Sequence, residues 1–208
     1  MRVVSSLEAR YWLAAIVAFA LFGVLGSVVS SRPPSAIDVA GAALRGEATP
    51  VAAFFTALGR TYALLAIAAC GVGIAFLART SPLPVIVVIV AQVLSQGVVA
   101  SLKPLFHRLR PDHWLLYRET DLSFPSGHAT TSIVFFLSLA LLALRVPNVP
   151  RAVNLSLATL AGICVVAIPW SRLALGAHYV TDVTGGLLFG AGTLCIALAL
   201  LARFGALA

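Results

Sequence analysis

Six long apolar runs, none of which contains a charged residue, divide this chain of 208 residues. They cover residues 12–29, 62–78, 83–102, 129–144, 153–170 and 183–202. A helix needs about 20 apolar residues to cross the hydrocarbon core of a bilayer, so each run is long enough to cross it or nearly so. The runs do not alternate with polar residues, which favours helices over a β-barrel. We therefore predict an all-α fold, an integral membrane bundle of six transmembrane helices.

The composition agrees with lipid as the main solvent of this chain. Hydrophobic residues make up 61% of the sequence and charged residues 10%, which is far from the balance of a soluble domain. The net charge of +7 could suggest a nucleic-acid partner, but the basic residues lie in short loops between the apolar runs. We expect a lipid partner and no nucleic acid. No linker divides the sequence, so residues 1–208 are predicted to form a single membrane-embedded domain.

The two longest loops, residues 30–61 and 103–128, fall on the same side of the membrane in any arrangement of six spanning helices. With the N-terminus in the cytoplasm, this side is extracytoplasmic. The positive-inside rule is not met by count, because these outer loops hold more basic residues than the inner ones. We assign several outer basic residues a chemical role that overrides the rule. The prediction is a multi-pass protein of the cell membrane whose active site faces the extracytoplasmic side.

Two basic residues, Lys103 and Arg110, follow the third apolar run and lie seven positions apart. If the helix continues, two turns return both cations to one face. Pro111 disfavours helical backbone at the residue before it and predicts a helix end at Arg110. Taken alone, such a pair is typical of interfacial anchors.

A second polar group, Ser126, Gly127 and His128, comes directly before the fourth run. The N-terminus of a helix attracts anions through its free backbone N–H groups and its dipole. Ser126 is suited to cap this helix or to donate to a bound phosphate. An imidazole has an ordinary pKa near neutrality, which suits His128 to protonate a leaving oxygen.

A third group, Arg172, His178 and Asp182, lies between the fifth and sixth runs. His178 and Asp182 are four positions apart, so on a helix the carboxylate accepts a hydrogen bond from one imidazole nitrogen. The other nitrogen is then free to attack phosphorus. Together with the two groups above, this pair indicates a phosphate site with a nucleophile, an orienting acid and a proton donor.

These groups carry a family resemblance. The segments KPLFHRLRP (residues 103–111), PSGH (125–128) and SRLALGAHYVTD (171–182) resemble the three consecutive motifs of the type 2 phosphatidic acid phosphatase (PAP2) superfamily, in its bacterial membrane lipid phosphatase branch. All three motifs are intact and in order, which is far more specific than any one of them. The resemblance covers more than half of the chain.

The resemblance implies a role for each matched residue. The phosphoryl oxygens would be bound by Lys103, Arg110, Ser126, Gly127 and Arg172. His178 would attack phosphorus, Asp182 would orient it, and His128 would protonate the leaving group. Water would then hydrolyse the phosphohistidine, with His128 as the base. No metal and no other cofactor is implied, since three cations and a helix terminus can neutralise the charge of the transferring group.

The resemblance also implies a lipid phosphate as substrate. The candidates are phosphatidic acid, phosphatidylglycerol phosphate and a polyprenyl diphosphate such as undecaprenyl diphosphate; a short, loop-poor chain favours the last two. The apolar residues expected beside the lipid chain are Trp114, Leu115, Leu116 and Tyr117. The oligomeric state is left open.

Three other functions stay in view. A transporter usually carries ionisable residues near the bilayer midplane, whereas the charges of this chain gather at one edge. A haloperoxidase holds vanadate in the same kind of cage, but the apolar runs argue against it. A lipid phosphotransferase, which passes the phosphoryl group to another lipid, is not separated from a hydrolase by the sequence.

Other residues near these motifs receive structural interpretations. We interpret as solvated loop residues His107, Arg108, Asp112, His113 and Arg118. Gln92 and Gln96 are expected to form interhelical hydrogen bonds, and Gly186 and Gly190 to allow close helix packing. The apolar stretch 51–58 is too short to span and is predicted to lie at the interface, with a substrate gate as the alternative.

Overall fold

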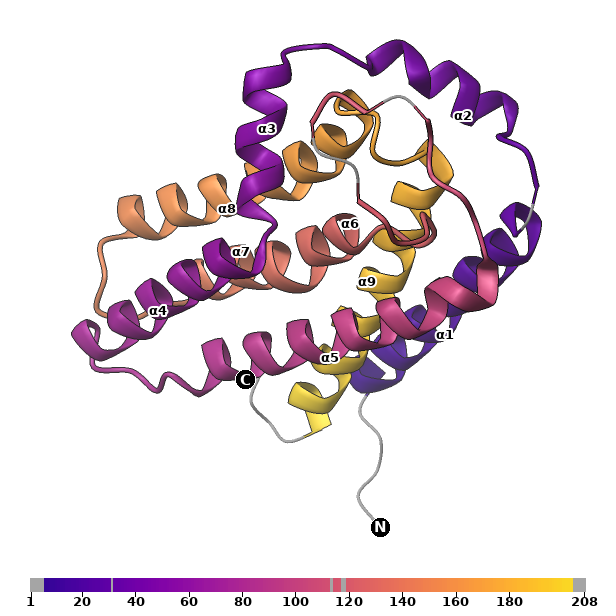
Figure 1. Cartoon of the computed structure of the whole chain (residues 1–208). Coiled ribbons are helices and arrows are strands. Elements are labelled where there is room, and N and C mark those ends of the chain that lie inside the picture. Colours follow the sequence, from indigo (N-terminus) through magenta and orange to yellow (C-terminus); the bar gives the residue numbers. More distant parts are fainter. Residues whose placement is uncertain (1–5, 31, 113, 117–118, 204–208) are drawn as a thin grey trace.

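The computed structural model describes residues 6–30, 32–112, 114–116 and 119–203, and every regular element within them is helical (Figure 1). The elements are α1 (Ser6–Val29), α2 (Ala36–Gly41), η1 (Ala42–Leu44), α3 (Thr49–Leu58), α4 (Thr61–Leu77), α5 (Leu83–Phe106), α6 (Gly127–Thr131), η2 (Ser132–Leu137), α7 (Ser138–Ala143), α8 (Arg151–Ala174) and α9 (Val180–Arg203). The predicted all-α class is confirmed for these residues.

Four helices, α1, α5, α8 and α9, are each 24 residues long and apolar enough to cross a membrane. Helix α4 follows α3 after a bend of 61°, and the two together would make a fifth span. The continuous stretch Gly127–Ala143, which joins α6, η2 and α7, has only 17 residues. The chain is therefore a membrane protein with four or five helices of spanning length in its described part, and the runs predicted at 62–78 and 129–144 form shorter helices.

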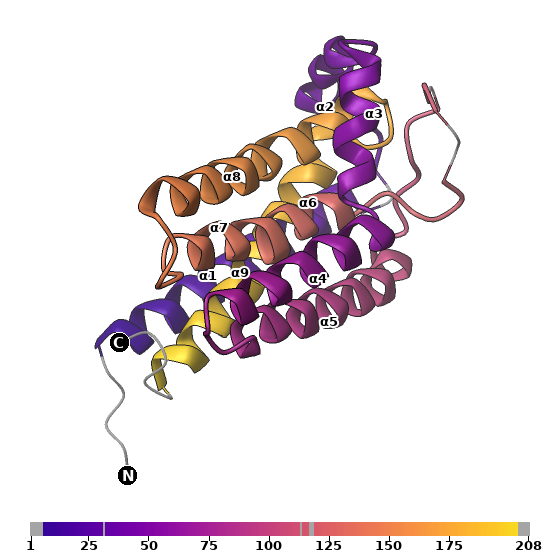
Figure 2. The same cartoon turned by 90° about the vertical axis from the view of Figure 1, so that its left-hand side faces the viewer.

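The long helices form one bundle, with α4, α5, α7 and α8 side by side in both views (Figures 1 and 2). Helix α1 packs along α9 over much of its length, and Phe19 lies against Gly192, where an added Cβ would be 2.7 Å from its ring. At one end of this pair, Arg203 and Glu8 form an ion pair of 3.4 Å. At the other end of the bundle, α2, α3 and the loop before α6 gather around the start of α9 (Figure 1).

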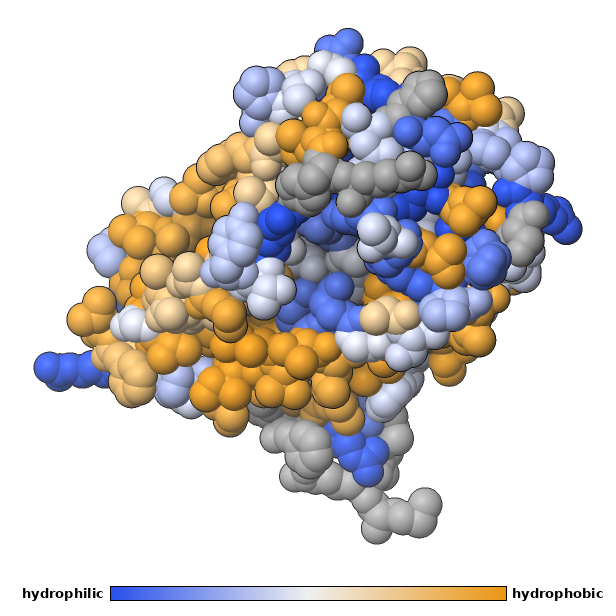
Figure 3. Space-filling model, viewed as in Figure 1, coloured by the Kyte–Doolittle hydropathy of each residue, from blue (hydrophilic) through white to orange (hydrophobic). Residues whose placement is uncertain are grey.

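Polar and apolar surfaces are separated on this molecule. Large apolar side chains on the sides of the helices are exposed, among them Leu13, Leu65 and Val93 at 61–65%. Figure 3 shows a broad apolar face, with polar residues collected around a hollow near α3 and the loop before α6. Exposed leucine and valine side chains are stable where lipid covers them, so the polar hollow marks the end of the bundle that meets water.

An aromatic cluster fixes the segment that leads into α6. The ring of Phe124, which is fully buried, stacks on Phe22 of α1 at 5.5 Å and meets Phe106 of α5 edge-on at 4.9 Å. Phe189 of α9 completes the cluster. Such pairs contribute about 0.5–1.5 kcal/mol each beyond their buried area. The start of α6 is thus held against three of the long helices.

Two glycines of α9 allow α6 to pack against it, as the sequence predicted. A Cβ on Gly186 would lie 2.8 Å from Cβ of Ala129 and closer still to the carbonyl of Ser126. A Cβ on Gly190 would lie 2.9 Å from Ile133. The close approach also allows the Thr130 hydroxyl to donate to the carbonyl of Gly186 at 3.1 Å.

We expect Gly186→Ala to destabilise the protein by about 1–3 kcal/mol, because the added methyl group pushes against the backbone of Ser126. Gly23→Ala in α1 is the matched control, since nothing lies within 4 Å of its Cβ position and a helical Gly→Ala change is otherwise stabilising. Thermal unfolding in detergent measures both. Equal melting temperatures for the two variants would contradict this packing.

Candidate active site

The first polar group begins on α5 and continues beyond it. The helix ends at Phe106, because His107 adopts a left-handed conformation with φ 46°, so the predicted helix end at Arg110 was wrong. The loop nevertheless brings Arg110 back to the site. Its Nη1 donates to the carbonyl of Ala177 at 2.9 Å and its Nε to the carbonyl of Asp121 at 3.0 Å. Cζ of this guanidinium lies 5.3 Å from the centroid of the Trp114 ring.

The second polar group forms the start of α6. Ser126 is the N-cap of this helix, and its hydroxyl accepts from the backbone N–H of Ala129 at 3.4 Å. Its own backbone N–H donates to the carbonyl of Asp182 at 3.1 Å. Gln96 of α5 donates to the carbonyl of Gly127 at 3.2 Å. The predicted interhelical role of this glutamine is therefore confirmed, and the start of α6 is tied to both α5 and α9.

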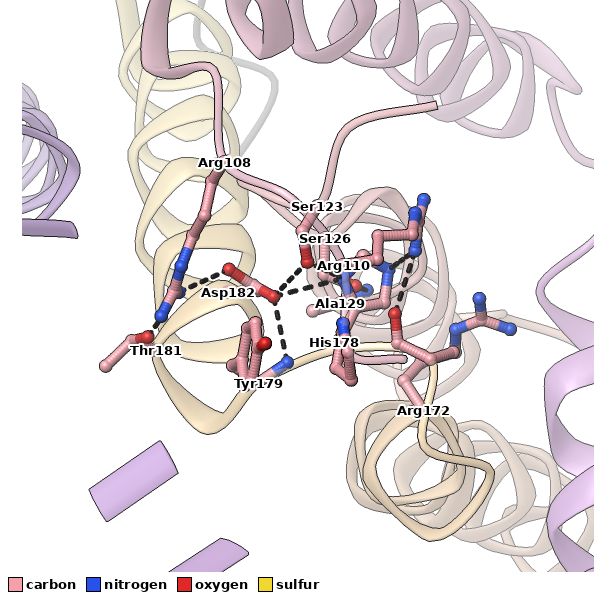
Figure 4. Close-up of polar contacts among 12 residues, drawn as sticks. Arg108, Arg110, Ser123, Ser126, Ala129, Arg172, His178, Tyr179, Thr181 and Asp182 are labelled. Carbon is pink, nitrogen blue, oxygen red and sulfur yellow. Dashed lines mark hydrogen bonds and ion pairs between the residues drawn. The ribbon is translucent and has the colours of Figure 1, made fainter. Parts of the chain in front are cut away.

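The third group comes from the end of α8 and the start of α9: Arg172 lies in the last turn of α8, His178 on the turn that follows and Asp182 in the first turn of α9 (Figure 4). Nε2 of His178 lies 2.9 Å from Nη1 of Arg110, and its Nδ1 lies 3.5 Å from Oδ2 of Asp182. A guanidinium only donates, so Nε2 accepts and the proton belongs on Nδ1, facing Asp182. Burial, and then the charges of Arg110, Arg172 and Lys103, hold the pKa of His178 well below its usual value. At neutral pH His178 is therefore a neutral imidazole whose Nε2 lone pair points toward Arg110.

Asp182, in the first turn of α9, has a fully buried carboxylate with several donors. The backbone N–H of Tyr179 donates to its Oδ2 at 2.8 Å, and the hydroxyl of Ser123 donates to the same oxygen. Nη1 of Arg108 donates to its Oδ1 at 2.5 Å. These contacts fix the carboxylate that faces His178.

Arg108 is not the solvated loop residue that we expected from the sequence. Its side chain is 3% exposed and pairs with two carboxylates, Asp182 and Asp38 of α2. Of the other four loop residues interpreted in that way, His107 and Asp112 are exposed, while His113 and Arg118 lie outside the described residues, as does Tyr117.

Helix α3 contributes to the site through Thr56. Its carbonyl lies 3.2 Å from Nε2 of His128, and its hydroxyl accepts from Nη1 of Arg172 at 2.7 Å. Gly59, at the end of α3, leaves room for the imidazole, since a Cβ there would be 2.6 Å from Cδ2 of His128. The predicted interfacial segment 51–58 is thus a helix whose inner face contacts two of the predicted site residues.

Two acids that the sequence analysis did not single out, Glu119 and Asp121, neutralise the cations of the site. Glu119 pairs with Arg172 at 2.7 Å and with Arg110 at 2.9 Å. Asp121 pairs with Arg110 at 2.5 Å and with Lys103. Burial raises the pKa of Asp121, but the hydrogen bond from Lys103 and the charge of Arg110 outweigh it and leave this pKa below its usual value. Both carboxylates lie where an anionic ligand of these cations would bind.

A cavity of about 700 Å³ lies beside these residues and is also lined by α4 and α5. Its polar end is lined by Lys103, Arg110, His128 and His178. The rest of its wall is mainly apolar and comes largely from α4 and α5, with Leu65, Ala68, Ile89 and Val93 beside the amides of Gln92 and Gln96. Within the described residues, no group of three or more His, Cys, Asp or Glu side chains could hold a metal ion. The arrangement suits a ligand with an anionic head and an apolar chain.

The family model described as PAP2 superfamily matches residues 84–205. The chain belongs to the PAP2 superfamily. The matched segment contains all eight predicted site residues: Lys103, Arg110, Ser126, Gly127, His128, Arg172, His178 and Asp182. The structure brings these residues of the PAP2 motifs to one end of the bundle.

Three curated relatives are phosphatases of lipid phosphates by their names. Phosphatidylglycerophosphatase B of Bacillus subtilis is 36% identical over 43% of this chain and 44% of its own. Lipid A 1-phosphatase of Rhizobium johnstonii is 36% identical over 55% and 47%. Decaprenylphosphoryl-5-phosphoribose phosphatase of Mycobacterium tuberculosis is 35% identical over 47% and 50%. The matches thus span about half the length of these relatives.

The fold of this PAP2 chain is also similar to a solved one. A crystal structure of a transmembrane PAP2 type phosphatidylglycerolphosphate phosphatase from Bacillus subtilis superposes with a TM-score of 0.74. The match covers 91% of this chain and 96% of the other, at 23% sequence identity. The two chains share the arrangement of helices.

We expect Glu119→Gln to tighten the binding of inorganic phosphate or vanadate several-fold, because an anion then displaces a neutral amide from Arg110 and Arg172. Inhibition or calorimetric titration of the purified protein measures this affinity. Glu47→Gln, which alters an exposed acid of the first long loop, is the control. Weaker anion binding by Glu119→Gln would show that the acid organises the cations and does not compete for them.

Proposed function

We propose that this chain is a membrane lipid phosphatase that removes a terminal phosphate through a phosphohistidine on His178. The observation that carries this proposal is the orientation of the His178 imidazole. Its Nδ1 faces the buried carboxylate of Asp182, and its Nε2 faces the cations at the head of the cavity. A neutral imidazole held in this way is a ready nucleophile.

In the proposed reaction, the phosphoryl oxygens replace the carboxylates of Glu119 and Asp121 on the cations. The oxygens are then held by Lys103, Arg110 and Arg172, with Ser126 and Gly127 at the start of α6. Such fixed positive groups stabilise the charge that spreads over the transferring phosphoryl group. The resting ion pairs keep the cations in place before substrate arrives.

Two steps complete the proposed reaction. Nε2 of His178 forms a bond to phosphorus while the bond from phosphorus to the leaving oxygen breaks, and His128, which takes up a proton when the phosphate dianion binds beside it, gives that proton to the leaving oxygen. The positive charge that grows on His178 is stabilised by Asp182. In the second step His128 takes a proton from water, which attacks phosphorus, and the N–P bond breaks to release phosphate.

We infer that the substrate is a lipid whose chain lies in the apolar part of the cavity between α4 and α5. The named substrates of the relatives are all lipids that carry a phosphate. Phosphatidylglycerol phosphate and a polyprenyl diphosphate remain our first choices, with phosphatidic acid as the third. Their terminal phosphate lies at the level of the headgroups, which is where the cations of the site gather.

We also infer that all six apolar helices cross the membrane. The stretch Gly127–Ala143 of 17 residues is about 25 Å long at 1.5 Å per residue, which nearly spans a hydrocarbon core of about 30 Å. In this topology α4 crosses alone, while α3 lies in the interface above it. With the N-terminus in the cytoplasm, the site then faces the extracytoplasmic side of the cell membrane.

We expect purified protein in detergent to release phosphate from at least one of three lipids: phosphatidic acid, phosphatidylglycerol phosphate and a polyprenyl diphosphate. His178→Ala removes the nucleophile and should abolish this release, while Asp182→Asn should slow it by about 10²–10⁴-fold through loss of the orienting charge. A phosphate-release assay on each lipid measures both variants.

The assay is run in EDTA, and activity is expected to survive it and to be blocked by vanadate. Loss of activity that added divalent metal restores would contradict this mechanism. Transfer of phosphate onto an added lipid alcohol, with little free phosphate, would identify a phosphotransferase. A fully active His178→Ala variant would exclude the phosphohistidine.

A further inference from the structure

Behind the His178–Asp182 pair lies a second ion pair that the reaction above does not use. Nη1 of Arg108 donates to Asp182 at 2.5 Å, and Nη2 donates to Asp38 at 2.8 Å. The side chain of Arg108 is 3% exposed, and both carboxylates are fully buried. One guanidinium therefore joins two acids that are 144 positions apart in the sequence, on α2 and on α9.

Asp38 accepts more hydrogen bonds than the cap of a short helix requires. Its Oδ1 accepts from the backbone N–H of Thr181 at 2.9 Å and from the Thr181 hydroxyl at 2.8 Å. Its Oδ2 accepts from the backbone N–H of Ser35 at 3.0 Å and from the Ser35 hydroxyl at 2.8 Å. Burial raises the pKa of Asp38, but the hydrogen bonds from Thr181 and Ser35 outweigh it and lower this pKa. The carboxylate is therefore anionic at neutral pH.

The position of Asp182 depends on this network. Thr181, its chain neighbour, is bound to Asp38 through backbone and side chain, and the Thr181 hydroxyl also accepts from Nη1 of Arg108 at 2.5 Å. The ring of Tyr179 lies under the guanidinium at 4.6 Å. Arg108 and Asp38 together therefore contact Tyr179, Thr181 and Asp182 around the first turn of α9. A buried ion pair is poor evidence for stability alone, because the desolvation of each charge offsets its attraction.

The charge of the network bears on the chemistry. Arg108 alone would oppose the positive charge that grows on His178 during attack, because it binds the carboxylate that stabilises this charge. Asp38 compensates for it: two carboxylates and one guanidinium leave a single net negative charge beside the imidazole. Asp182 can then act as an anion toward His178 while Arg108 holds it in one orientation.

We propose that Asp38 and Arg108 are positioning residues of the phosphatase reaction, which hold Asp182 in orientation and preserve its negative charge toward His178. This assignment rests on the proposed phosphohistidine mechanism. It gives α2 a role in catalysis, although none of the residues of α2 lines the cavity that holds the nucleophile. It also makes the Arg108 of the first motif distinct in role from Arg110, which faces the phosphate.

The test compares Asp38→Asn with Glu47→Gln. Asp38→Asn keeps the shape of the side chain but removes the compensating charge, and we expect kcat to fall about tenfold or more. The KM and the inhibition constant of vanadate should stay within about twofold, because the phosphate-binding cations are unchanged. Glu47→Gln removes the charge of an exposed acid in the same long loop, outside this network, and its kcat should stay near that of the wild type.

A pair of variants at Thr181 gives the same test without removing a buried charge. Thr181→Val removes the hydroxyl that joins Asp38 and Arg108 at nearly constant shape, and kcat should fall several-fold with KM unchanged. Thr181→Ser retains the hydroxyl and should restore kcat. Failure of the serine variant to differ from the valine variant would overturn the assignment, even if Asp38→Asn did not fold.

A double-mutant cycle identifies the residue through which Asp38 acts. On the Asp182→Asn background, Asp38→Asn should cause no further loss of kcat, since the group that it positions is already neutral. An equal loss on both backgrounds, or an unchanged kcat in Asp38→Asn alone, would overturn the assignment. Those results leave the proposed function intact as long as His178→Ala is inactive. An active His178→Ala would remove the mechanism and this assignment together.

Discussion

The carboxylate of Asp182 is the point on which the rest of the site depends. Asp182 lies in the first turn of α9, where the helix dipole favours a negative charge. Its side chain and its backbone bind segments that are far apart in the sequence. The side chain accepts from Arg108 and Ser123, and the backbone carbonyl accepts from Ser126 at the start of α6. One residue therefore joins the loop after α5, the start of α6 and the start of α9.

Packing among α1, α5, α6 and α9 supports this arrangement of polar residues. The glycines of α9 let the backbone of α6 approach closely, and the aromatic cluster around Phe124 holds the segment before α6 against α1, α5 and α9. These contacts are apolar and lie inside the bundle, so they fix the polar residues without competing for their hydrogen bonds. A shift at Gly186 would move Ser126, and with it one of the donors expected to bind phosphate.

The sequence predicted which residues meet but not always why. His178 and Asp182 do face each other, yet α9 begins at Val180, so His178 lies on the preceding turn and not on the helix that we assumed. The contact arises because Asp182 caps the backbone N–H of Tyr179. Arg108 and Asp38 were not recognised, because their partners lie 70 or more positions away and nothing in local spacing distinguishes a buried arginine from a solvated one. The early end of α5 was missed for a related reason, since the left-handed conformation of His107 has no proline or glycine to signal it.

The acids of the site fall into two kinds, and exposure separates them. Asp38 and Asp182 have fully buried carboxylates, so neither can leave its cation without a large desolvation penalty for both partners. The side chains of Glu119 and Asp121 are 25% and 52% exposed, so they can exchange a cation for water at little cost. In the proposed mechanism, a phosphate displaces the second kind and not the first. The proposed nucleophile is then oriented by a fixed set of charges, while an exchangeable set of acids pairs with the cations until substrate binds.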